Sequence, residues 1–239
     1  MLKITDLVKS YDGKTNAVNH INLEIKKGEI FGFIGHNGAG KTTTIKSVVG
    51  LLPFENGVIK INGYDITKDT LEAKKQMVYI PDNPDLYESL TGIQFLNFIC
   101  DIYSISKEQR NKDIKHYADL FELTKNLGDS ISSYSHGMKQ KLALISAFIR
   151  HPKLLIFDEP FVGLDPKAMH LVKQLMRKIC DEGNSVFFST HVLDVAEKLC
   201  DRIAIISHGE IVAYGTMEEV KGNQSLEDVF LELENGDNK

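Results

Sequence analysis

The chain has 239 residues, enough to bury a full hydrophobic core in one domain, and its formal net charge at pH 7 is −5. This slightly acidic balance argues against a nucleic-acid partner, because phosphate backbones bind to basic faces. The three cysteines, Cys100, Cys180 and Cys200, fall in no metal-ligand or disulfide spacing, so we expect reduced core thiols in a cytosolic protein. Neither a signal segment nor an apolar run of membrane-spanning length is found, so we expect any work at a membrane to need a separate chain.

The first part of the chain is expected to be rich in β-strand. Leu2–Ile4 and Ile21–Ile25 alternate apolar and polar side chains, and Tyr11–Lys14 between them has the composition of a turn. The short apolar run Ile30–Ile34 predicts a buried strand, and Thr42–Val49 predicts a helix.

A glycine-rich loop joins that strand to that helix and matches the pattern G-x-x-x-x-G-K-[ST]. The loop and the threonine after it comprise Gly35, His36, Asn37, Gly38, Ala39, Gly40, Lys41, Thr42 and Thr43. Glycines let backbone N–H groups converge on a phosphate at the helix N-terminus. Lys41 would reach the β- and γ-phosphates, and the Thr42 hydroxyl would ligate Mg²⁺. The sequence therefore predicts a nucleoside triphosphate site.

The middle of the chain changes from strand to helix. Met77–Ile80 predicts a short strand, and the segment from about 85 to 150 predicts helices. Thr91 and Ser106 each open a capping-box pattern, and a third helix is expected over Gly137–Ile149. We expect this block to be a helical subdomain inserted between the strands of a sheet.

The last third returns to strand. Three continuous apolar runs suit parallel strands that are buried on both faces, namely Leu154–Phe157, Ser185–Ser189 and Ile203–Ile206. Asp165 and Pro166 predict the start of the intervening helix, with Asp165 as N-cap. We expect a short C-terminal helical tail over about 216–239, with helices near Thr216–Glu219 and Ser225–Leu233 and disorder over Glu234–Lys239.

Polar residues at two of the predicted strand ends are candidates for catalysis. Asp158 and Glu159 follow the strand that begins at Leu154, at the sheet edge where open α/β folds bind ligands. Beside a phosphate loop, Asp158 would hold Mg²⁺ through a water, and Glu159 would polarise the attacking water as general base. His191, at the end of another strand, would donate to the γ-phosphate or serve a structural role, and the residues alone leave both open.

The order of these motifs resembles the ATP-binding subunit of an ABC (ATP-binding cassette) transporter, and the similarity covers essentially the whole chain. The resemblance implies an α/β fold in a single domain over residues 1–239. This fold has a P-loop NTPase core with a mostly parallel sheet, an N-terminal antiparallel β subdomain and the inserted helical subdomain. It also implies ATP hydrolysis with Mg²⁺, coupled to transport.

Further site residues follow from the resemblance. Tyr11 matches the aromatic residue that stacks on adenine, although a turn tyrosine can instead pack on the sheet. Tyr134–Met138 stands in the place of the family signature LSGGQ, and its ATP-contacting residues would be Ser135, His136 and Gly137. Gly163–Asp165 matches the D-loop, and His191 matches the switch histidine.

Partners also follow from the resemblance. In this family the signature binds the γ-phosphate held by another subunit, so two nucleotides are sandwiched in a head-to-tail dimer. The implied partners are a second copy of the chain or a paralogous ATPase subunit, and a polytopic membrane permease, with no nucleic acid. The chain would then act as a peripheral subunit on the cytoplasmic face of the cell membrane. Its signature, Phe161–Asp165 and Ser225–Phe230 resemble bacterial exporters of the multidrug or antimicrobial-peptide resistance kind.

The sequence departs from the family pattern at two places. His136 replaces a glycine of the signature, and Asp82 stands where the family has the Q-loop glutamine. An ionised carboxylate accepts hydrogen bonds but does not donate them, so we expect Asp82 to join the Mg²⁺ shell rather than donate to the nucleotide. The alternative is that Asp82 only caps the turn after Pro81.

Other classes of protein use similar motifs. A soluble ABC ATPase acting in DNA repair or translation usually has a long coiled-coil insertion or two cassettes, which this sequence lacks. A nucleotide kinase or a GTPase would share the phosphate loop but would not explain Tyr134–Met138. For a transporter, we expect the permease to dock between the loop Asp82–Leu90 and the helix after Thr91, where Leu86 and Tyr87 either face the partner or fold back.

Overall fold

The computed structural model describes residues 1–236, and within them the strands form two sheets. The smaller sheet is antiparallel, and its strands lie in the order β2-β1-β4-β5. In that order they span Asn16–Ile25, Leu2–Ser10, Asn56–Ile61 and Tyr64–Asp65. The larger sheet has the order β10-β9-β3-β8-β7-β6. Its strands span, in that order, Glu210–Thr216, Arg202–Ser207, Ile30–Ile34, Ser185–Thr190, Leu154–Asp158 and Met77–Ile80.

The larger sheet is mostly parallel, as the continuous apolar runs predict. Strand β3 lies between β9 and β8 and is parallel to both, and β7 is parallel to β8 and β6. Among the described strands of this sheet, only the edge strand β10 is antiparallel to its neighbour. Because the parallel strands share one direction, their carboxyl ends meet at one edge of the sheet, which is where a ligand site is expected.

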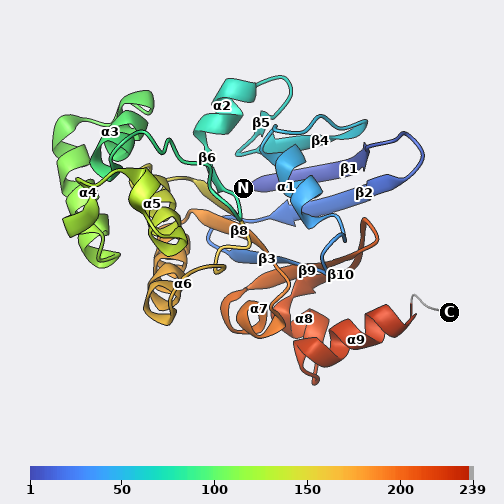
Figure 1. The fold of residues 1–239 in the computed structure, drawn as a ribbon. Helices are drawn as coiled ribbons and strands as arrows, with labels where there is room; N and C mark the ends of the chain where they lie inside the picture. Colours follow the sequence, from blue (N-terminus) through green and yellow to red (C-terminus); the bar gives the residue numbers. More distant parts are fainter. Residues whose placement is uncertain (237–239) are drawn as a thin grey trace.

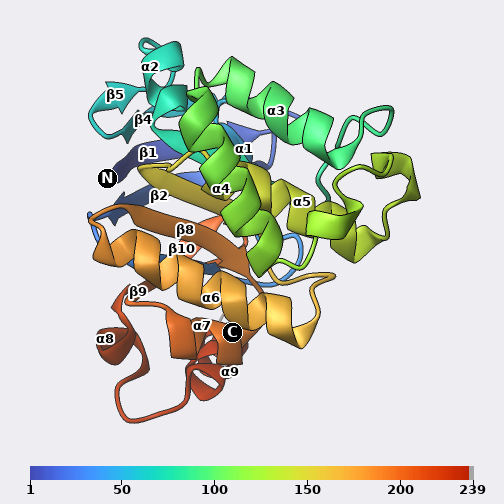
Figure 2. The same cartoon turned by 90° about the vertical axis from the view of Figure 1, so that its left-hand side faces the viewer.

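The helices occupy distinct regions around the sheets (Figures 1 and 2). Helices α1 and α2 lie near the antiparallel sheet and span Lys41–Val48 and Thr70–Lys75. Helices α3, α4, α5 and α6 gather at the other end of the molecule and span Gly92–Ile102, Lys107–Leu120, His136–Phe148 and Pro166–Asp181. Two 3₁₀ turns join α4 to α5, Thr124–Asn126 and Ile131–Ser133. Helices α7, α8 and α9 are grouped together and span Leu193–Leu199, Met217–Lys221 and Leu226–Gly236.

Two apolar cores cover opposite faces of the larger sheet. Along β7, Leu154 and Ile156 pack into the core shared with α1 and the antiparallel sheet, while Leu155 and Phe157 pack into the core shared with the helices. All four side chains are fully buried. Alternate residues of a strand point to opposite faces, so a strand between two cores must be apolar along its whole length.

Several predicted helix starts are present as capping interactions. Thr91 and Thr216 form full capping boxes, and the Ser106 hydroxyl accepts from the backbone N–H of Gln109. The Asp165 carboxylate accepts from Ala168 and is followed by Pro166 at the first position of α6. These signals are local in sequence, which is why they can be read without the fold.

The prediction was wrong at the C-terminus and incomplete elsewhere. Helix α9 continues to Gly236, so the expected disorder from Glu234 does not begin there, and residues 237–239 lie outside the described residues. Leu226 and Phe230 are buried against the rest of the protein and anchor this helix. The sequence reading also missed α2, α7 and the edge strand β10, each of which is short or only partly buried. Within residues 1–236, no helix combines the length and apolar character that crossing a membrane requires.

Candidate functional site

A pocket of about 340 Å³ opens where the glycine-rich loop meets the carboxyl ends of the central strands. We call this pocket the nucleotide pocket. It is lined by Tyr11, Ala17, His36, Asn37, Gly38, Gly40, Lys41, Thr42, Thr43, Asp82, Asp158 and Glu159. These residues come from five separate parts of the chain, and all except Ala17 were candidates from the sequence. An alanine carries no chemical signal, so sequence reasoning had no means of finding Ala17.

The glycine-rich loop is pressed against neighbouring backbone. Gly40 has a φ of 108°, and a Cβ there would lie 2.5 Å from the carbonyl oxygen of Ala17. A Cβ on Gly35 would lie equally close, 2.5 Å, to the carbonyl oxygen of Ile206. Glycine is therefore required at both positions, for conformation at Gly40 and for space at both. No side chain caps α1 at Gly40, so the first-turn N–H groups of that helix are directed to the pocket for an anion.

Lys41 is buried and held by the loop that precedes it. Its Nζ donates to the carbonyl oxygens of Gly35 at 2.5 Å and His36 at 3.0 Å, and lies 3.8 Å from Glu159 Oε1. Burial lowers the pKa of Lys41 below its ordinary value, while the carboxylates of Glu159 and Asp158 act in the opposite direction. The side chain is thus an ammonium donor next to two acids, ready to exchange backbone carbonyls for phosphate oxygens.

The two acids at the end of β7 have different surroundings. Asp158 is only 2% exposed, and its Oδ1 accepts from the hydroxyl of Ser189 at 2.5 Å. Glu159 has a φ of 51°, a left-handed conformation that costs a non-glycine residue about 1 kcal/mol or more. This conformation turns the chain at the strand end, and Glu159 Oε1 lies 2.9 Å from Nδ1 of His191. One carboxylate is buried and the other is directed toward a titratable partner.

Tyr11 and Asp82 lie at the more open parts of the pocket. Tyr11 is 66% exposed, and its hydroxyl lies 3.2 Å from Oγ1 of Thr43. Asp82 lines the pocket, but its Oδ1 also accepts from the backbone N–H of Asn83 at 2.8 Å. Asp82 therefore lines the pocket and also accepts a hydrogen bond within the turn after Pro81. Burial, followed by the charges of Asp158 and Asp82, raises the pKa of Tyr79, which places both acids near one tyrosine.

The oxygen ligands at this end of the pocket suit Mg²⁺. Thr42 supplies a hydroxyl, and Asp158 and Asp82 supply carboxylates, which are the hard donors that Mg²⁺ prefers. Among residues 1–236, no cluster of three or more acidic, histidine or cysteine side chains forms a complete metal cage. A magnesium site that borrows phosphate oxygens from its substrate needs only one or two carboxylates, so the residues present fit that kind of site.

The signature segment, Tyr134–Met138, does not line this pocket. Ser135 is the N-cap of α5 and accepts from the backbone N–H of Met138 at 3.3 Å. The ring of His136 packs on Gly163, where an added Cβ would lie 2.5 Å from its Cδ2 atom. Five residues after His136 on α5, Lys141 forms an ion pair with Asp165 at 2.7 Å. The signature segment is thus attached to the loop before α6 and not to the glycine-rich loop of its own chain.

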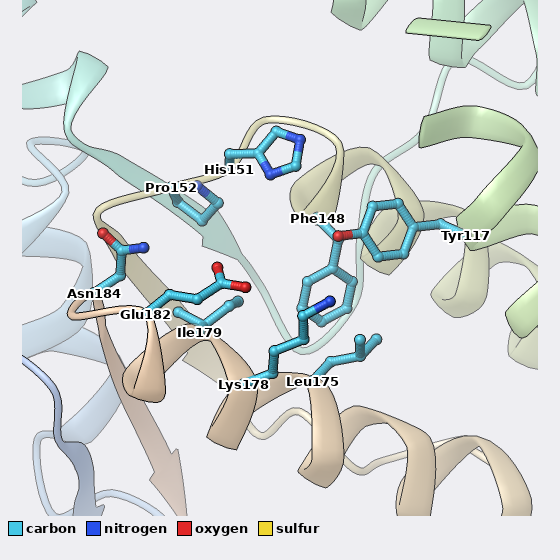
Figure 3. Close-up of a pocket in the computed structure, with 9 residues that line it drawn as sticks. All are labelled: Tyr117, Phe148, His151, Pro152, Leu175, Lys178, Ile179, Glu182 and Asn184. Atoms are coloured by element: carbon cyan, nitrogen blue, oxygen red, sulfur yellow. The ribbon is translucent and has the colours of Figure 1, made fainter. Parts of the chain in front are cut away.

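A second cavity, drawn in Figure 3, has a different character. Tyr117 and Phe148 from α4 and α5 face Leu175 and Lys178 from α6 across it, and its volume is about 90 Å³. Small-molecule sites of ordinary size measure about 300–1,000 Å³. The nucleotide pocket falls in that range, and the cavity between the helices does not.

The sequence reading also missed two residues that organise the site. Ser189 bridges Asp158 and Glu159 by hydrogen bonds, and Lys141 ties α5 to Asp165. A signal for Ser189 was present, since a serine inside the apolar strand Ser185–Thr190 must find a hydrogen-bond partner when it is buried. Lys141 had no such signal, because lysines on helices usually face solvent.

Comparisons with known proteins agree with this geometry. The family model described as ABC transporter matches residues 18–162. The chain is 36% identical over 238 residues to the ABC-type transporter ATP-binding protein EcsA of Bacillus subtilis, covering 98% of this chain and 96% of that protein. It is also 36% identical over 220 residues to the linearmycin resistance ATP-binding protein LnrL of the same organism, covering 92% of this chain and 70% of that protein.

A solved structure resembles the whole arrangement. It is the dimeric structure of a post-hydrolysis state of an ATP-binding cassette bound to ADP and Pi, with a TM-score of 0.82 and 25% sequence identity. The similarity covers 91% of this chain and 99% of that one. The likeness therefore extends over most of the fold.

Proposed function

Because the chain belongs to the ABC transporter family of ATP-binding proteins, we propose that it is the motor subunit of an exporter, in which two copies sandwich two ATP molecules head to tail. The chain is an ATPase and an ATP-binding subunit of a transporter. The proposed unit is one ATP-binding domain over residues 1–239, with a helical subdomain at about 85–150 and a C-terminal helical tail from about 216.

One observation supports the head-to-tail dimer above the others. The signature segment lies outside the nucleotide pocket of its own chain and has Ser135 and His136 exposed at the start of α5. A hydroxyl and helix N-terminal N–H groups form an anion site. In a second copy they face the phosphates that the first copy holds. Val162, which is 47% exposed and precedes the Gly163 on which His136 packs, is an apolar side chain that a partner copy would cover.

The residues of the pocket divide the reaction among them. Tyr11 stacks on adenine at the open end, while Gly35, Asn37, Gly38, Ala39, Gly40 and Thr43 wrap the phosphates with backbone or hydroxyl donors. Lys41 moves from the carbonyls of Gly35 and His36 to the β- and γ-phosphates. Thr42, Asp158 and Asp82 would hold Mg²⁺, which would neutralise charge on the phosphates when bound.

Glu159 and His191 act on the water and the γ-phosphate. Glu159 takes a proton from the attacking water as general base. The contact of 2.9 Å between its Oε1 and His191 Nδ1 fixes the carboxylate and leaves the far nitrogen, Nε2, for the γ-phosphate. From the second copy, Ser135, His136 and Gly137 contribute hydrogen bonds to the same phosphate.

A complementation experiment tests the head-to-tail arrangement. Lys41→Ala disables the phosphate side of a site, and Ser135→Ala disables the signature side. If the two sides come from different copies, mixing the two variants creates one intact site in each mixed dimer, so ATP turnover per Ser135→Ala chain should rise when Lys41→Ala protein is added. If each site belongs to a single chain, the Lys41→Ala protein should leave that turnover unchanged.

The membrane partner is proposed to be a polytopic permease that docks on the helical side of the molecule. Tyr87 is 58% exposed and packs edge to face on Phe98 at 5.5 Å, while Leu86 is partly buried and packs against the core. A separate groove of about 230 Å³ is lined by strand β6 and by residues that follow α1, α3 and α5. It includes Leu51, which is 61% exposed, and Tyr103, whose ring lies 3.6 Å from the Arg150 guanidinium. Exposed apolar side chains around a groove suit a partner helix.

Crosslinking from position 87 tests this docking site. Cys100, Cys180 and Cys200 are buried, so a cysteine introduced by Tyr87→Cys should react selectively. It should crosslink to a co-expressed permease, whereas Tyr64→Cys, a partly exposed position on β5 of the antiparallel sheet, should not. Equal crosslinking from both positions would contradict the proposed docking site.

The export direction rests on likeness to LnrL, whose name records linearmycin resistance, and on the sequence features of the signature and tail. The proposed location is the cytoplasmic face of the membrane. A soluble ATPase acting in DNA repair or translation is not favoured, since the relatives named above are transporter subunits. Loss of the gene should increase cellular accumulation of an exported compound; decreased accumulation would indicate import.

A further inference from the structure

We propose that Ser189 is a positioning residue that orients Asp158 and Glu159 together for metal binding and water activation. The proposal rests on the functions proposed above for these two acids. It concerns how the chain holds them in place, which neither the glycine-rich loop nor the signature segment explains.

The first step is the register of the sheet. Strand β7 pairs with β8 in parallel, and Asp158 stands directly opposite Ser189. In such a pair both side chains point to the same face. A serine at this place therefore meets the carboxylate across the strand interface, where a larger apolar side chain would be the ordinary choice for a buried strand.

The second step is the burial of the hydroxyl and the number of bonds it makes. Ser189 is fully buried, so its Oγ has to find partners within the protein. It donates to Asp158 Oδ1 at 2.5 Å and accepts from the backbone N–H of Glu159 at 3.1 Å. The Ser189 hydroxyl thus donates one hydrogen bond and accepts another, and its two partners are consecutive acidic residues.

The third step concerns what each bond fixes. The bond to Oδ1 sets the rotamer of Asp158, since a carboxylate with one oxygen held by a buried donor cannot rotate freely. The bond from the Glu159 N–H holds the backbone just where φ takes the left-handed value of 51°. The direction of the Glu159 side chain toward His191 and Lys41 depends on that backbone conformation. Ser189 therefore acts through both acids without touching the nucleotide.

The chain offers a matched control on the same strand. Ser185 is also fully buried, and its Oγ donates to the carbonyl oxygen of Lys26 at 2.8 Å, at the opposite end of β8. Ser185→Ala removes a buried hydroxyl of the same kind but leaves Asp158 and Glu159 alone. A purely structural role for Ser189 predicts that Ser189→Ala and Ser185→Ala behave alike.

The experiment compares both variants with the wild type in the full chain. Mn²⁺ replaces Mg²⁺ as probe, and electron paramagnetic resonance measures its affinity for the ATP complex. Loss of an outer-sphere partner of a metal ligand typically weakens metal affinity or activity by about 10- to 100-fold. Ser189→Ala should show a loss of that order in Mn²⁺ affinity and in kcat, while ATP binding without metal changes less than about twofold. Ser189→Thr, which keeps the hydroxyl, should recover most of the affinity.

The outcomes separate this proposal from the proposed function. Wild-type Mn²⁺ affinity in Ser189→Ala, or equal losses in Ser185→Ala, would overturn the role of Ser189. A wild-type rate in Glu159→Gln would overturn the role of Glu159 instead, whatever Ser189→Ala does. If Ser189→Ala does not fold, Ser189→Cys replaces it, because cysteine has a similar volume but is a weak hydrogen-bond donor. A Mn²⁺ affinity of Ser189→Cys no lower than that of Ser185→Ala would then overturn the role of Ser189.

Discussion

Lys41, Asp158 and Glu159 of the nucleotide pocket have side chains that are at most 16% exposed, whereas Ser135 and His136 of the signature segment are exposed. The pocket residues are linked to one another by Ser189 and by the carbonyls of the loop. The signature segment is held by the bond from the Tyr134 hydroxyl to the Asn126 carbonyl oxygen and by the contact of His136 with Gly163, and not by the glycine-rich loop. This contrast between a buried pocket and an exposed signature segment is the one that the proposed head-to-tail pair requires.

Because of this difference, substitutions in the nucleotide pocket and substitutions in the signature segment should have different measurable effects. Changes to the pocket residues that contact the phosphates should weaken ATP binding by a single chain. Changes in the signature segment should leave binding intact and affect only steps that need two chains. The following variants test that division, beginning with the largest expected effect.

Lys41→Ala should abolish measurable ATP hydrolysis and weaken ATP binding, because the ammonium that offsets the β- and γ-phosphate charge is lost. Turnover and equilibrium binding of a fluorescent ATP analogue measure both effects. Lys46→Ala is the matched control, since Lys46 lies on the same helix but is exposed in its last turn. A wild-type rate of ATP hydrolysis in Lys41→Ala would contradict the assignment of the glycine-rich loop to the ATP site.

Glu159→Gln should slow hydrolysis by roughly 10²- to 10⁴-fold, the usual size of a lost general base, and leave ATP binding intact. Because the ATP between the two copies is then hydrolysed too slowly for them to separate, a dimer should accumulate on size exclusion with ATP and Mg²⁺. A strictly monomeric variant under saturating ATP would contradict the head-to-tail arrangement.

Ser135→Ala should lower hydrolysis by roughly 30-fold while single-chain ATP binding is unchanged, since a hydrogen bond to a charged group contributes about 2 kcal/mol. The variant also loses the N-cap of α5, a stability cost of about 1 kcal/mol. Ser106→Ala is matched for that loss, because Ser106 caps α4 with the same distance of 3.3 Å. If both variants lower turnover equally, the signature segment has only a structural role.

Asp82→Gln should keep activity within about tenfold of the wild type, or about 1.4 kcal/mol of barrier, because it restores the amide that the family pattern implies at the Q-loop. Asp82→Asn should shift the Mg²⁺ titration of hydrolysis modestly. If neither substitution moves that titration, the bond from the Asn83 N–H is the only role of Asp82.

The local features of this protein follow from its sequence for local reasons. Glycine spacing in 35–42, apolar runs in the central strands and the caps at Thr91 and Asp165 act over a few residues, so each could be read before the fold was known. The apolar runs also predicted a parallel sheet, and strand ends in such a sheet converge. That is why loop residues and Asp158, more than a hundred positions apart, were expected in one site.

Other features depend on which distant residues meet, and no local pattern encodes that. The register of β7 on β8 places Ser189 against Asp158, and the packing of α5 on the loop before α6 places His136 on Gly163. The full length of α9 likewise depends on the burial of Leu226 and Phe230 against the rest of the protein. That burial is not encoded locally, so the polar end of the helix was predicted to be disordered. Sequence determines which side chains are available, whereas tertiary packing decides which pairs touch, because contact energies come from neighbours that the chain brings together only when it folds.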